Sequence, residues 1–328
     1  MSDLINRVGV FTSGGDSPGM NACIRAVVRA ALFHELQVYG IMRGYQGMIE
    51  DEFKPMTSRS VSNIIQRGGT ILKTARSKDF MTVEGMDKAY QHMRAHQIDA
   101  LIAIGGDGTF KGAEEFCKRF PDVKIIGIPG TIDNDLAGTD YTLGFDTAVN
   151  TTIEAIDKIR DTAASHDRCF FIEVMGRDSG CIALWAGVAG GSESILLPER
   201  ETDLNGLVSK LEKGARENKS SSIVIVAEGE NNGGAQNIAN QLKARLSHYE
   251  TKVTVLGHVQ RGGSPTAFDR ILAARFGVRS IECLLAGENR VMVGIKNNQV
   301  SLTPLSHATK QHDPLDADLF KISEILSI

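Results

Sequence analysis

Short runs of β-branched and apolar residues alternate with amphipathic segments along most of this chain of 328 residues. Several runs are apolar throughout, which is typical of strands that are covered on both faces of a mainly parallel sheet. The nine runs predicted to be strands are residues 8–12, 38–42, 100–104, 124–129, 169–174, 194–197, 222–228, 253–257 and 291–295. Because helical patterns separate them, they indicate an α/β fold, and their number favours two sheets over one.

The segments between these runs carry apolar residues at helical spacing. The four stripes are Ile24, Val27, Val28, Ala31 and Leu32; Leu204, Leu207, Val208 and Leu211; Ile238, Leu242 and Leu246; and Ala274, Gly277, Val278, Ile281, Leu284 and Leu285. Each stripe predicts a helix packed on a sheet. At roughly 150 residues per domain, the length agrees with two domains.

Composition and charge exclude several classes of protein. The net charge of -4 argues against a broad nucleic-acid-binding surface. No run of about 18 apolar residues predicts a membrane span, and the N-terminal residues do not resemble a signal peptide. The five cysteines are scattered without a CxxC pair, which favours reduced packing residues and a cytoplasmic location.

Glycine with a charged or polar residue follows six of the predicted strands. These strand ends begin at residues 13, 105, 130, 175, 228 and 257, and glycine makes up about 10% of the chain, against a usual ~7%. A single glycine at a strand end usually makes a turn only. In open α/β sheets, however, ligands bind beyond the carboxyl ends of the strands, so the repeated pattern predicts a ligand site.

The loop Gly105-Gly106-Asp107-Gly108-Thr109 precedes a helical segment. Successive glycines allow backbone N–H groups to converge on phosphate oxygens at the start of a helix, and the Asp107 carboxylate can bind Mg²⁺. Neither GxxxxGK[ST] nor GxGxxG occurs in the chain, so a nucleotide site here is of another type. Gly14 and Gly15 supply a second close backbone approach.

The loop at residues 130–135 holds Thr131, Asp133, Asn134 and Asp135. One interpretation is an Asx-turn network, in which the side chains bond to their own backbone. The other is that one aspartate acts as general base for a hydroxyl while the second organises the loop or a metal.

Arginines near these loops are candidates for binding phosphate, because guanidinium groups match phosphate oxygens bidentately. Arg168 precedes a predicted strand and Arg177 follows it, so they lie at opposite edges of the sheet and cannot share one local site. Arg76 and Arg261 are further candidates. Each taken alone could equally be a solvated surface residue.

These motifs together resemble the bacterial type of ATP-dependent 6-phosphofructokinases. The matching segments are residues 12–16, 67–70, 105–109, 129–135, 175–177 and 257–265, in the family's order and spacing. The resemblance covers nearly the whole chain. The GGDGT segment alone would be a weak signal, because NAD kinases and diacylglycerol kinases also use it.

The resemblance implies transfer of phosphate from MgATP to the 1-hydroxyl of fructose 6-phosphate. Asp133 would be the base, Thr131 and Arg177 would steady the transferred phosphoryl group, and Asp107 would bind Mg²⁺. The implied ATP site is Gly15, Arg76, Ser77, Gly106, Asp107, Gly108 and Thr109. The implied sugar-phosphate site is Thr131, Asp133, Met175, Gly176, Arg177, Glu228, His258 and Arg261, with Arg168 and Lys252 supplied by a neighbouring subunit.

The resemblance also implies two doubly wound, Rossmann-like α/β domains with the active site in the cleft between them. The expected ATP-binding domain is residues 1–143 plus 259–305, and the expected fructose-6-phosphate-binding domain is residues 144–258 plus 306–328. A cytoplasmic homotetramer is the family expectation.

The chain departs from the family pattern at three places. Lys252 stands where a well-studied member has Arg, which keeps the charge but loses the planar fork. Ser77 stands where an aromatic residue can flank the adenine.

The regulatory site matches at Arg25, Arg29, Arg160, Glu193 and Lys219. However, Glu217, Ser220 and Ser221 replace basic residues or His, and Ser58 replaces an Arg. Fewer cations predict weaker binding of ADP or phosphoenolpyruvate, although Arg25 and Arg29 could simply form a solvated helix face.

Three other functions remain as alternatives. The first is a kinase of the same family that uses pyrophosphate or sedoheptulose 7-phosphate. Relatives that use pyrophosphate place Asp at the position of Gly108 and Lys at that of Gly130, so the two glycines favour ATP. The second is a non-catalytic regulatory subunit that binds sugar phosphate, and such a subunit would be expected to lack Asp133, Asp107 or Arg177. The third, an NAD kinase, leaves the motifs after Pro129 unexplained.

Overall fold

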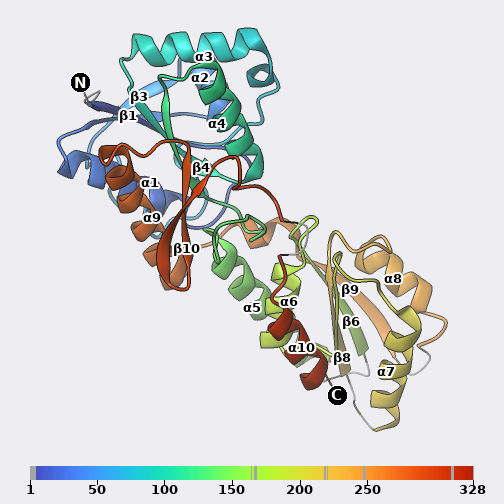
Figure 1. Ribbon diagram of the computed structural model, residues 1–328. Coiled ribbons are helices and arrows are strands. Elements are labelled where there is room, and N and C mark those ends of the chain that lie inside the picture. The colour runs from blue at the N-terminus through green and yellow to red at the C-terminus, as the bar shows by residue number, and fades with distance from the viewer. Residues whose placement is uncertain are drawn as a thin grey trace. The chain divides into compact units, whose positions relative to one another are not determined.

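A computed structural model shows the architecture (Figure 1) and describes residues 5–163, 165, 168–217, 219, 221–246, 249–311 and 314–327. These residues form two compact units. Unit 1 lies within Met1–Ile132, Leu136–Thr147 and Arg261–Gln311. Unit 2 lies within Asp133–Asp135, Ala148–Gln260 and His312–Ile328. The chain therefore returns to each unit after it has entered the other.

Unit 1 contains a seven-stranded sheet in the order β11-β10-β5-β4-β1-β2-β3. Its strands are β1 (Arg7–Thr12), β2 (Gln37–Ile41), β3 (Phe53–Met56), β4 (Ala100–Gly105), β5 (Lys124–Pro129), β10 (Val291–Lys296) and β11 (Gln299–Pro304). The five inner strands are parallel, and the edge strands β3 and β11 pair antiparallel with β2 and β10. Since β2 and β4 lie on opposite sides of β1, the order reverses between β1 and β4, which is where ligands bind in such sheets.

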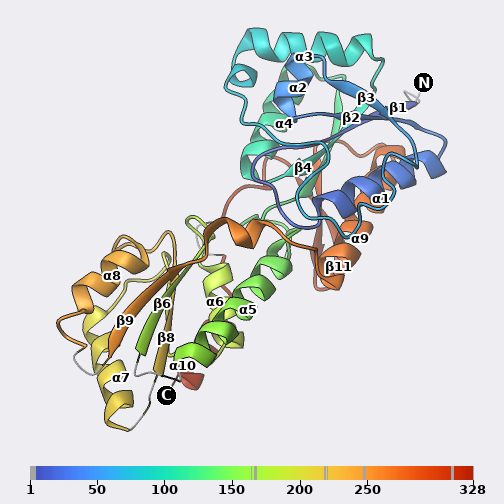
Figure 2. The same ribbon diagram turned by 180° about the vertical axis from the view of Figure 1, so that it is seen from behind.

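Helices cover both faces of this sheet (Figures 1 and 2). Helices α1 (Met20–Phe33) and α9 (Ala267–Leu285) share a core with Val8, Ile102 and Ile126. Helices α2 (Tyr45–Ile49), α3 (Val83–Ala95) and α4 (Asp107–Arg119) pack on the opposite face, against residues such as Phe11 and Leu101. Successive strand residues thus enter different cores, which explains why these strands are apolar throughout.

Unit 2 is built on a four-stranded parallel sheet in the order β7-β8-β6-β9. Its strands are β6 (Arg168–Val174), β7 (Ser194–Leu196), β8 (Ser221–Ala227) and β9 (Glu250–Val255). Helices α7 (Leu204–Arg216) and α8 (Gly234–Leu242) cover one face (Figure 2). Helices α5 (Phe145–Ala163), α6 (Cys181–Ala189) and α10 (Ala317–Leu326) lie on the other (Figure 2). In the part of the chain that the structure describes, no helix has the length and apolar character to cross a membrane.

The prediction of a mainly parallel α/β fold with two sheets is confirmed, and each of the nine predicted strands is present. Two strands, β3 and β11, were not predicted. Pro55 lies inside β3, and proline is tolerated in strands mainly at edges, so the sequence of β3 does not resemble a strand. β11 is partly exposed and alternates polar with apolar residues, and it too lies at an edge.

The predicted stripe on α9 is wrong in part. Gly277, Ile281 and Leu284 are buried, but Ala274, Val278 and Leu285 are exposed. The buried face instead includes Leu272, Ala273, Phe276 and Ser280, and it packs against α1. Apolar residues occur on both sides of this helix, so periodicity alone did not identify the face that the sheet covers. The third predicted stripe also runs past its helix, because α8 ends at Leu242.

A buried carboxylate, Asp269 of α9, caps the start of α5. Its oxygens accept hydrogen bonds from Gly144 N at 2.8 Å, Thr147 N at 2.9 Å and Thr147 Oγ1 at 2.5 Å. Burial raises the pKa of Asp269 from 3.8 to about 6, and these hydrogen bonds oppose the shift. Folding therefore favours the neutral acid relative to the unfolded chain, in which the carboxyl ionises near pH 3.8.

Replacing Asp269 with Asn is expected to change how stability depends on pH. Because the folded-state pKa exceeds the unfolded value, this group's contribution to stability is complete below about pH 4 and is lost as pH rises through about 6. The wild type should thus lose roughly 2 kcal/mol relative to Asp269→Asn between pH 4 and pH 7. Urea unfolding of both proteins across this range measures the difference, and a constant difference would contradict the prediction.

Candidate active site

Three of the predicted ligand-binding loops lie side by side at the carboxyl edge of the unit 1 sheet. Ser13 N, after β1, donates to Ile104 O of β4 at 3.0 Å, and Gly130 N, after β5, donates to Gly105 O at 2.9 Å. The loops after β1, β4 and β5 are therefore held in one row. This row includes the position between β1 and β4 where the strand order reverses.

Close packing explains several glycines in this row. A Cβ on Gly105 would lie 2.3 Å from Thr109 Oγ1 and 2.6 Å from Ser13 O. A Cβ on Gly106 would lie 3.7 Å from Thr131 Cβ, so Thr131 stands next to this loop. For Gly108, in the first turn of α4, no atom of the described residues lies within 4 Å of its Cβ position, apart from its chain neighbours and the backbone of α4 itself, so the mouth of the loop is open there. The exposed start of α4 can accept an anion.

The Asp107 carboxylate lies at the same helix start and is 24% exposed. It accepts hydrogen bonds from Lys111 Nζ at 2.7 Å and from Lys310 N at 3.3 Å. Among the described residues, no three carboxylate, histidine or cysteine side chains cluster as metal ligands. A single carboxylate is nevertheless suited to Mg²⁺, which commonly takes one or two carboxylates together with phosphate oxygens and water.

Other predicted ATP-site residues have different environments. Gly15 lies against the guanidinium of Arg261, a residue predicted for the sugar-phosphate site, which is 2.6 Å from the Gly15 Cβ position and donates to Asp16 O at 3.0 Å. Ser77 Oγ donates to Gln46 Oε1 at 2.6 Å. It also accepts from the backbone N of Phe80, in the short helix η1 (Asp79–Met81), at 3.1 Å. Arg76 is exposed.

In unit 2, the loop after β6 has an unusual backbone. Gly176 has a φ of 144° and Arg177 a φ of 54°, which is a left-handed value for a residue with a side chain. Glu228 Oε1, after β8, accepts from Gly176 N at 3.3 Å and from Arg177 N at 2.7 Å. Glu228 was predicted to contact the sugar phosphate, and within this unit its carboxylate holds the loop that carries Arg177.

The same loop meets the predicted base. Arg177 Nε lies 4.0 Å from Asp133 Oδ2, and the side chains are 53% and 9% exposed. Ser179 Oγ donates to Asp133 O at 2.8 Å, which anchors the Asp133 backbone to the residues after β6. Two predicted catalytic residues that are 44 positions apart are thus neighbours in unit 2. Thr131, the third, belongs to unit 1.

Arg168, the first residue of β6, lies at the other end of this strand from Arg177, as the order of residues predicted, and Lys252 lies on β9 in register with Phe170. Glu250 bridges them, since its carboxylate is 2.9 Å from Arg168 Nε and 2.6 Å from Lys252 Nζ. Hydrogen bonds from Lys252 and Arg168 lower the pKa of Glu250 to about 2. Glu250 was not predicted, although its position two residues before Lys252 on one face of β9 could have revealed it.

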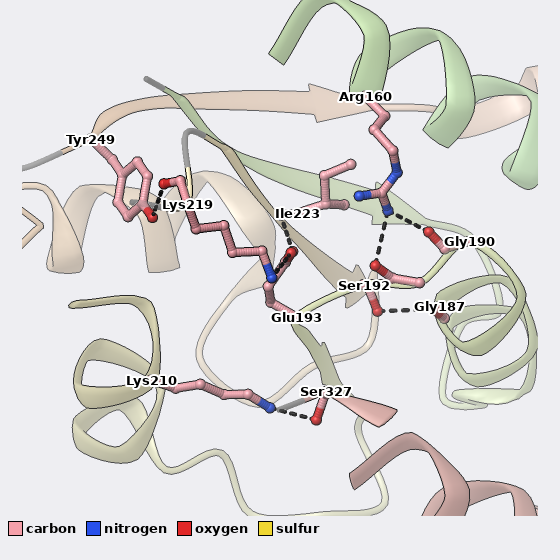
Figure 3. Close-up of polar contacts among 11 residues, drawn as sticks. Arg160, Gly187, Gly190, Ser192, Glu193, Lys210, Lys219, Ile223, Tyr249 and Ser327 are labelled. Atoms are coloured by element: carbon pink, nitrogen blue, oxygen red, sulfur yellow. Dashed lines mark hydrogen bonds and ion pairs between the residues drawn. The ribbon is translucent and has the colours of Figure 1, made fainter. Parts of the chain in front are cut away.

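The unit 2 members of the predicted regulatory site already have partners (Figure 3). Lys219 Nζ is 2.7 Å from Glu193 Oε1, and the Glu193 side chain is 8% exposed and also accepts from Ile223 N. Arg160 donates to Gly190 O and to Gly191 O. Arg25 and Arg29 lie four residues apart on α1 in unit 1. Ser220, one of the family departures, lies outside the described residues.

Gln260 and Tyr45 also support these loops and were not predicted. Gln260 Oε1 accepts from Met175 N at 2.9 Å, and Tyr45 Oη donates to Thr109 O at 2.6 Å. Gln260 stands between His258 and Arg261, so its place in the glycine-rich segment was a usable signal. Nothing in the sequence near Tyr45 links it to Thr109, 64 residues later. His258 is exposed, in the short helix η2 (Gly257–Arg261).

Comparison with known proteins agrees with this arrangement. The family model described as Phosphofructokinase matches residues 7–284. ATP-dependent 6-phosphofructokinase 1 of Thermus thermophilus is 55% identical over 99% of this chain and 100% of its own length. ATP-dependent 6-phosphofructokinase 2 of Bacteroides thetaiotaomicron is 53% identical over 98% of each chain.

Solved structures give the same result. The crystal structure of Pichia pastoris phosphofructokinase in the T-state superposes with a TM-score of 0.91 at 33% identity, covering 99% of this chain and 39% of that one. A pyrophosphate-dependent phosphofructokinase from Marinobacter aquaeolei superposes with a TM-score of 0.84 at 25% identity, over 98% of this chain and 91% of that one. With its loops, its fold and these relatives in agreement, the chain belongs to the phosphofructokinase family.

Proposed function

We propose that this protein transfers the terminal phosphoryl group of MgATP to the 1-hydroxyl of fructose 6-phosphate, which gives ADP and fructose 1,6-bisphosphate in glycolysis. The observation that carries the proposal is that the Asp133 carboxylate lies 4.0 Å from Nε of Arg177, which is on the loop after β6. A largely buried carboxylate can accept a proton from a hydroxyl, and an exposed guanidinium can stabilise the charge that develops on phosphate. The names of the relatives supply the substrates.

Unit 1 supplies the proposed nucleotide site. The backbone N–H groups of residues 106–109 and of Gly15 bind the phosphates, and Arg76 and Ser77 are the other residues that we assign to this site. Asp107 is the residue that would hold Mg²⁺, which neutralises phosphate charge when bound. Because phosphoryl transfer depends mainly on positioning and charge stabilisation, open glycine loops suit this role.

The residues proposed for the sugar-phosphate site lie mostly in unit 2, while Thr131 and Arg261 belong to unit 1. Asp133 takes the proton of the attacking hydroxyl, while Thr131 and Arg177 steady the transferred group. Met175, Gly176, Glu228, His258 and Arg261 complete the site for the sugar phosphate. Arg168 lies at the opposite end of β6 from Arg177, and Lys252 lies on β9 in register with Phe170, so we assign both to the 6-phosphate bound by a neighbouring subunit of a homotetramer.

We assign the ATP-binding role to a domain close to unit 1 and the sugar-binding role to one close to unit 2. The compartment we propose is the cytoplasm. In support, the five cysteines are all buried free thiols. Burial raises the pKa of Cys169 and of Cys181 to about 12, which keeps these thiols unreactive.

A coupled assay on the purified protein tests the function and its nearest rivals. We expect turnover with ATP and fructose 6-phosphate, and at most a small fraction of that rate with pyrophosphate or sedoheptulose 7-phosphate. Comparable rates with pyrophosphate would make the protein a pyrophosphate-dependent kinase. Binding of fructose 6-phosphate without turnover would favour the non-catalytic subunit.

Replacing Lys252 with Arg is expected to lower the KM for fructose 6-phosphate severalfold, because a planar guanidinium binds phosphate bidentately and an ammonium group does not. Steady-state kinetics at saturating ATP measure the change, and Lys252→Gln should raise the same KM. A KM for Lys252→Arg that is unchanged or higher would contradict this assignment.

Regulation by ADP and phosphoenolpyruvate is expected to be weak. Lys219 is engaged by Glu193 and Arg160 by two backbone carbonyls, and Glu217 adds a negative charge in place of a cation. Velocity against fructose 6-phosphate should be hyperbolic, with or without millimolar effector. A sigmoidal curve that ADP makes hyperbolic would refute this prediction.

A further inference from the structure

The residue Gln260 is fully buried at the end of the unit 2 segment that runs through β9. Both ends of its side-chain amide are hydrogen-bonded. Oε1 accepts from Met175 N at 2.9 Å, and Nε2 donates to Thr152 Oγ1 of α5 at 2.9 Å. Buried amides need such partners, because an unsatisfied buried polar group costs roughly 1–3 kcal/mol.

The hydroxyl of Thr152 determines which way this amide faces. Thr152 is fully buried, and its Oγ1 donates its single hydrogen to Ala148 O at 2.8 Å. The hydroxyl can therefore only accept a hydrogen bond from Gln260. The amide nitrogen Nε2, and not the oxygen Oε1, must then face Thr152. The carbonyl end of Gln260 is thereby directed at Met175 N.

The other side of this contact is the loop that carries Arg177. Three successive backbone N–H groups of this loop donate to side-chain oxygens. Met175 N donates to Gln260, and Gly176 N and Arg177 N donate to Glu228. The left-handed φ of Arg177 is a conformation that persists only where surrounding contacts hold it. Gln260 and Glu228 supply those contacts from two different strand ends.

We propose that Gln260 is a positioning residue that holds Met175–Arg177 in the conformation that brings the Arg177 guanidinium to Asp133. It touches neither Asp133 nor the Arg177 side chain directly. Its effect passes through the backbone of Met175, and Thr152 sets the direction of its amide. This inference rests on the proposed function, since it assigns Gln260 a role in that reaction.

Kinetics of Gln260→Leu test the proposal. We expect kcat to fall about 10- to 100-fold while the KM for ATP stays within twofold. Thr152→Val, a nearly isosteric change, should give a smaller loss in the same direction, and it keeps the test valid if Gln260→Leu does not fold. A matched control is Asn289→Leu, because Asn289 Oδ1 likewise accepts a backbone N–H, from Ile125 at 2.9 Å, near the amino end of β5 in unit 1. The control should lower stability and leave kcat unchanged.

Two further measurements separate positioning from simple packing. If Gln260 acts through Arg177, Gln260→Leu should lower kcat by less than twofold in an Arg177→Lys background. Equal losses in both backgrounds would overturn the proposal. Hydrogen exchange should speed up at residues 175–177 in Gln260→Leu and not in Asn289→Leu. Unchanged exchange in Gln260→Leu would also overturn it.

The outcomes also separate this inference from the proposed function. A wild-type protein without fructose-6-phosphate kinase activity refutes the proposed function, and hydrogen exchange then still decides whether Gln260 holds the loop. An active wild type whose Gln260→Leu and Thr152→Val variants keep normal kcat refutes only the role of Gln260.

Discussion

Replacing Asp133 with Asn should lower kcat by at least 10²- to 10⁴-fold, which is the usual contribution of a general base. Asparagine keeps the size of the side chain and its distance from Arg177 but cannot accept a proton at neutral pH. The Asp133 side chain is 9% exposed, and its backbone carbonyl is bonded to Ser179 Oγ, so the replacement should leave the loop in place. The loss should therefore lie in the chemical step.

Steady-state kinetics together with calorimetric titration of ATP measure this prediction. ATP affinity should remain close to that of the wild type, because the proposed nucleotide contacts lie in unit 1. Asp157→Asn, which removes an exposed carboxylate from α5, is the matched control and should retain full turnover. A value of kcat within a few-fold of wild type for Asp133→Asn would remove this residue from the mechanism.

The second large effect is expected for Gly108→Asp, for which kcat/KM for ATP should fall by about 10²- to 10³-fold. A carboxylate about 4 Å from a phosphate charge is repelled by roughly 4 kcal/mol at an effective dielectric of about 20. The fold should tolerate the change, because within the described part of the chain only neighbouring residues and the α4 backbone lie within 4 Å of a Cβ at this position. Aspartate is also favourable in the first turn of a helix.

The matched control is Gly108→Ala, which fills the same Cβ position without charge and should change kcat/KM by only a few-fold. Thermal unfolding of both variants checks that the fold is kept. Undiminished use of ATP by Gly108→Asp would mean that the phosphates do not lie at this loop, and it would favour another nucleotide position.

The sequence predicted the glycine-rich loops because each is marked by a pattern of a few consecutive residues. A strand buried on both faces must be apolar, and a backbone that approaches a neighbouring loop as closely as Gly105 does must lack a side chain. Asp107 could be named from such a segment alone, whereas the choice of Asp133 within its loop and of Arg177 among the arginines came from the family resemblance. The spacing of these loops along the chain identified the family.

Other features depend on neighbours far along the chain and could not be predicted from it. The edge strand β3 contains a proline and is a strand because β2 offers it partners. The buried face of α9 is set by α1. Glu250 acquires its role from the register that places it beside Arg168.

The amino-acid sequence by itself determined the α/β class, the strand ends that carry chemistry and the residues suited to phosphate transfer. Only the tertiary structure decided that Asp133 joins Arg177 in unit 2 and that Arg261 lies against Gly15 in unit 1. It also showed that Gln260, rather than a charged residue, supports the Arg177 loop. The physical reason is that strand and turn patterns reflect interactions within a few residues. Hydrogen bonds between strand ends depend instead on which strands lie next to each other in the folded sheets.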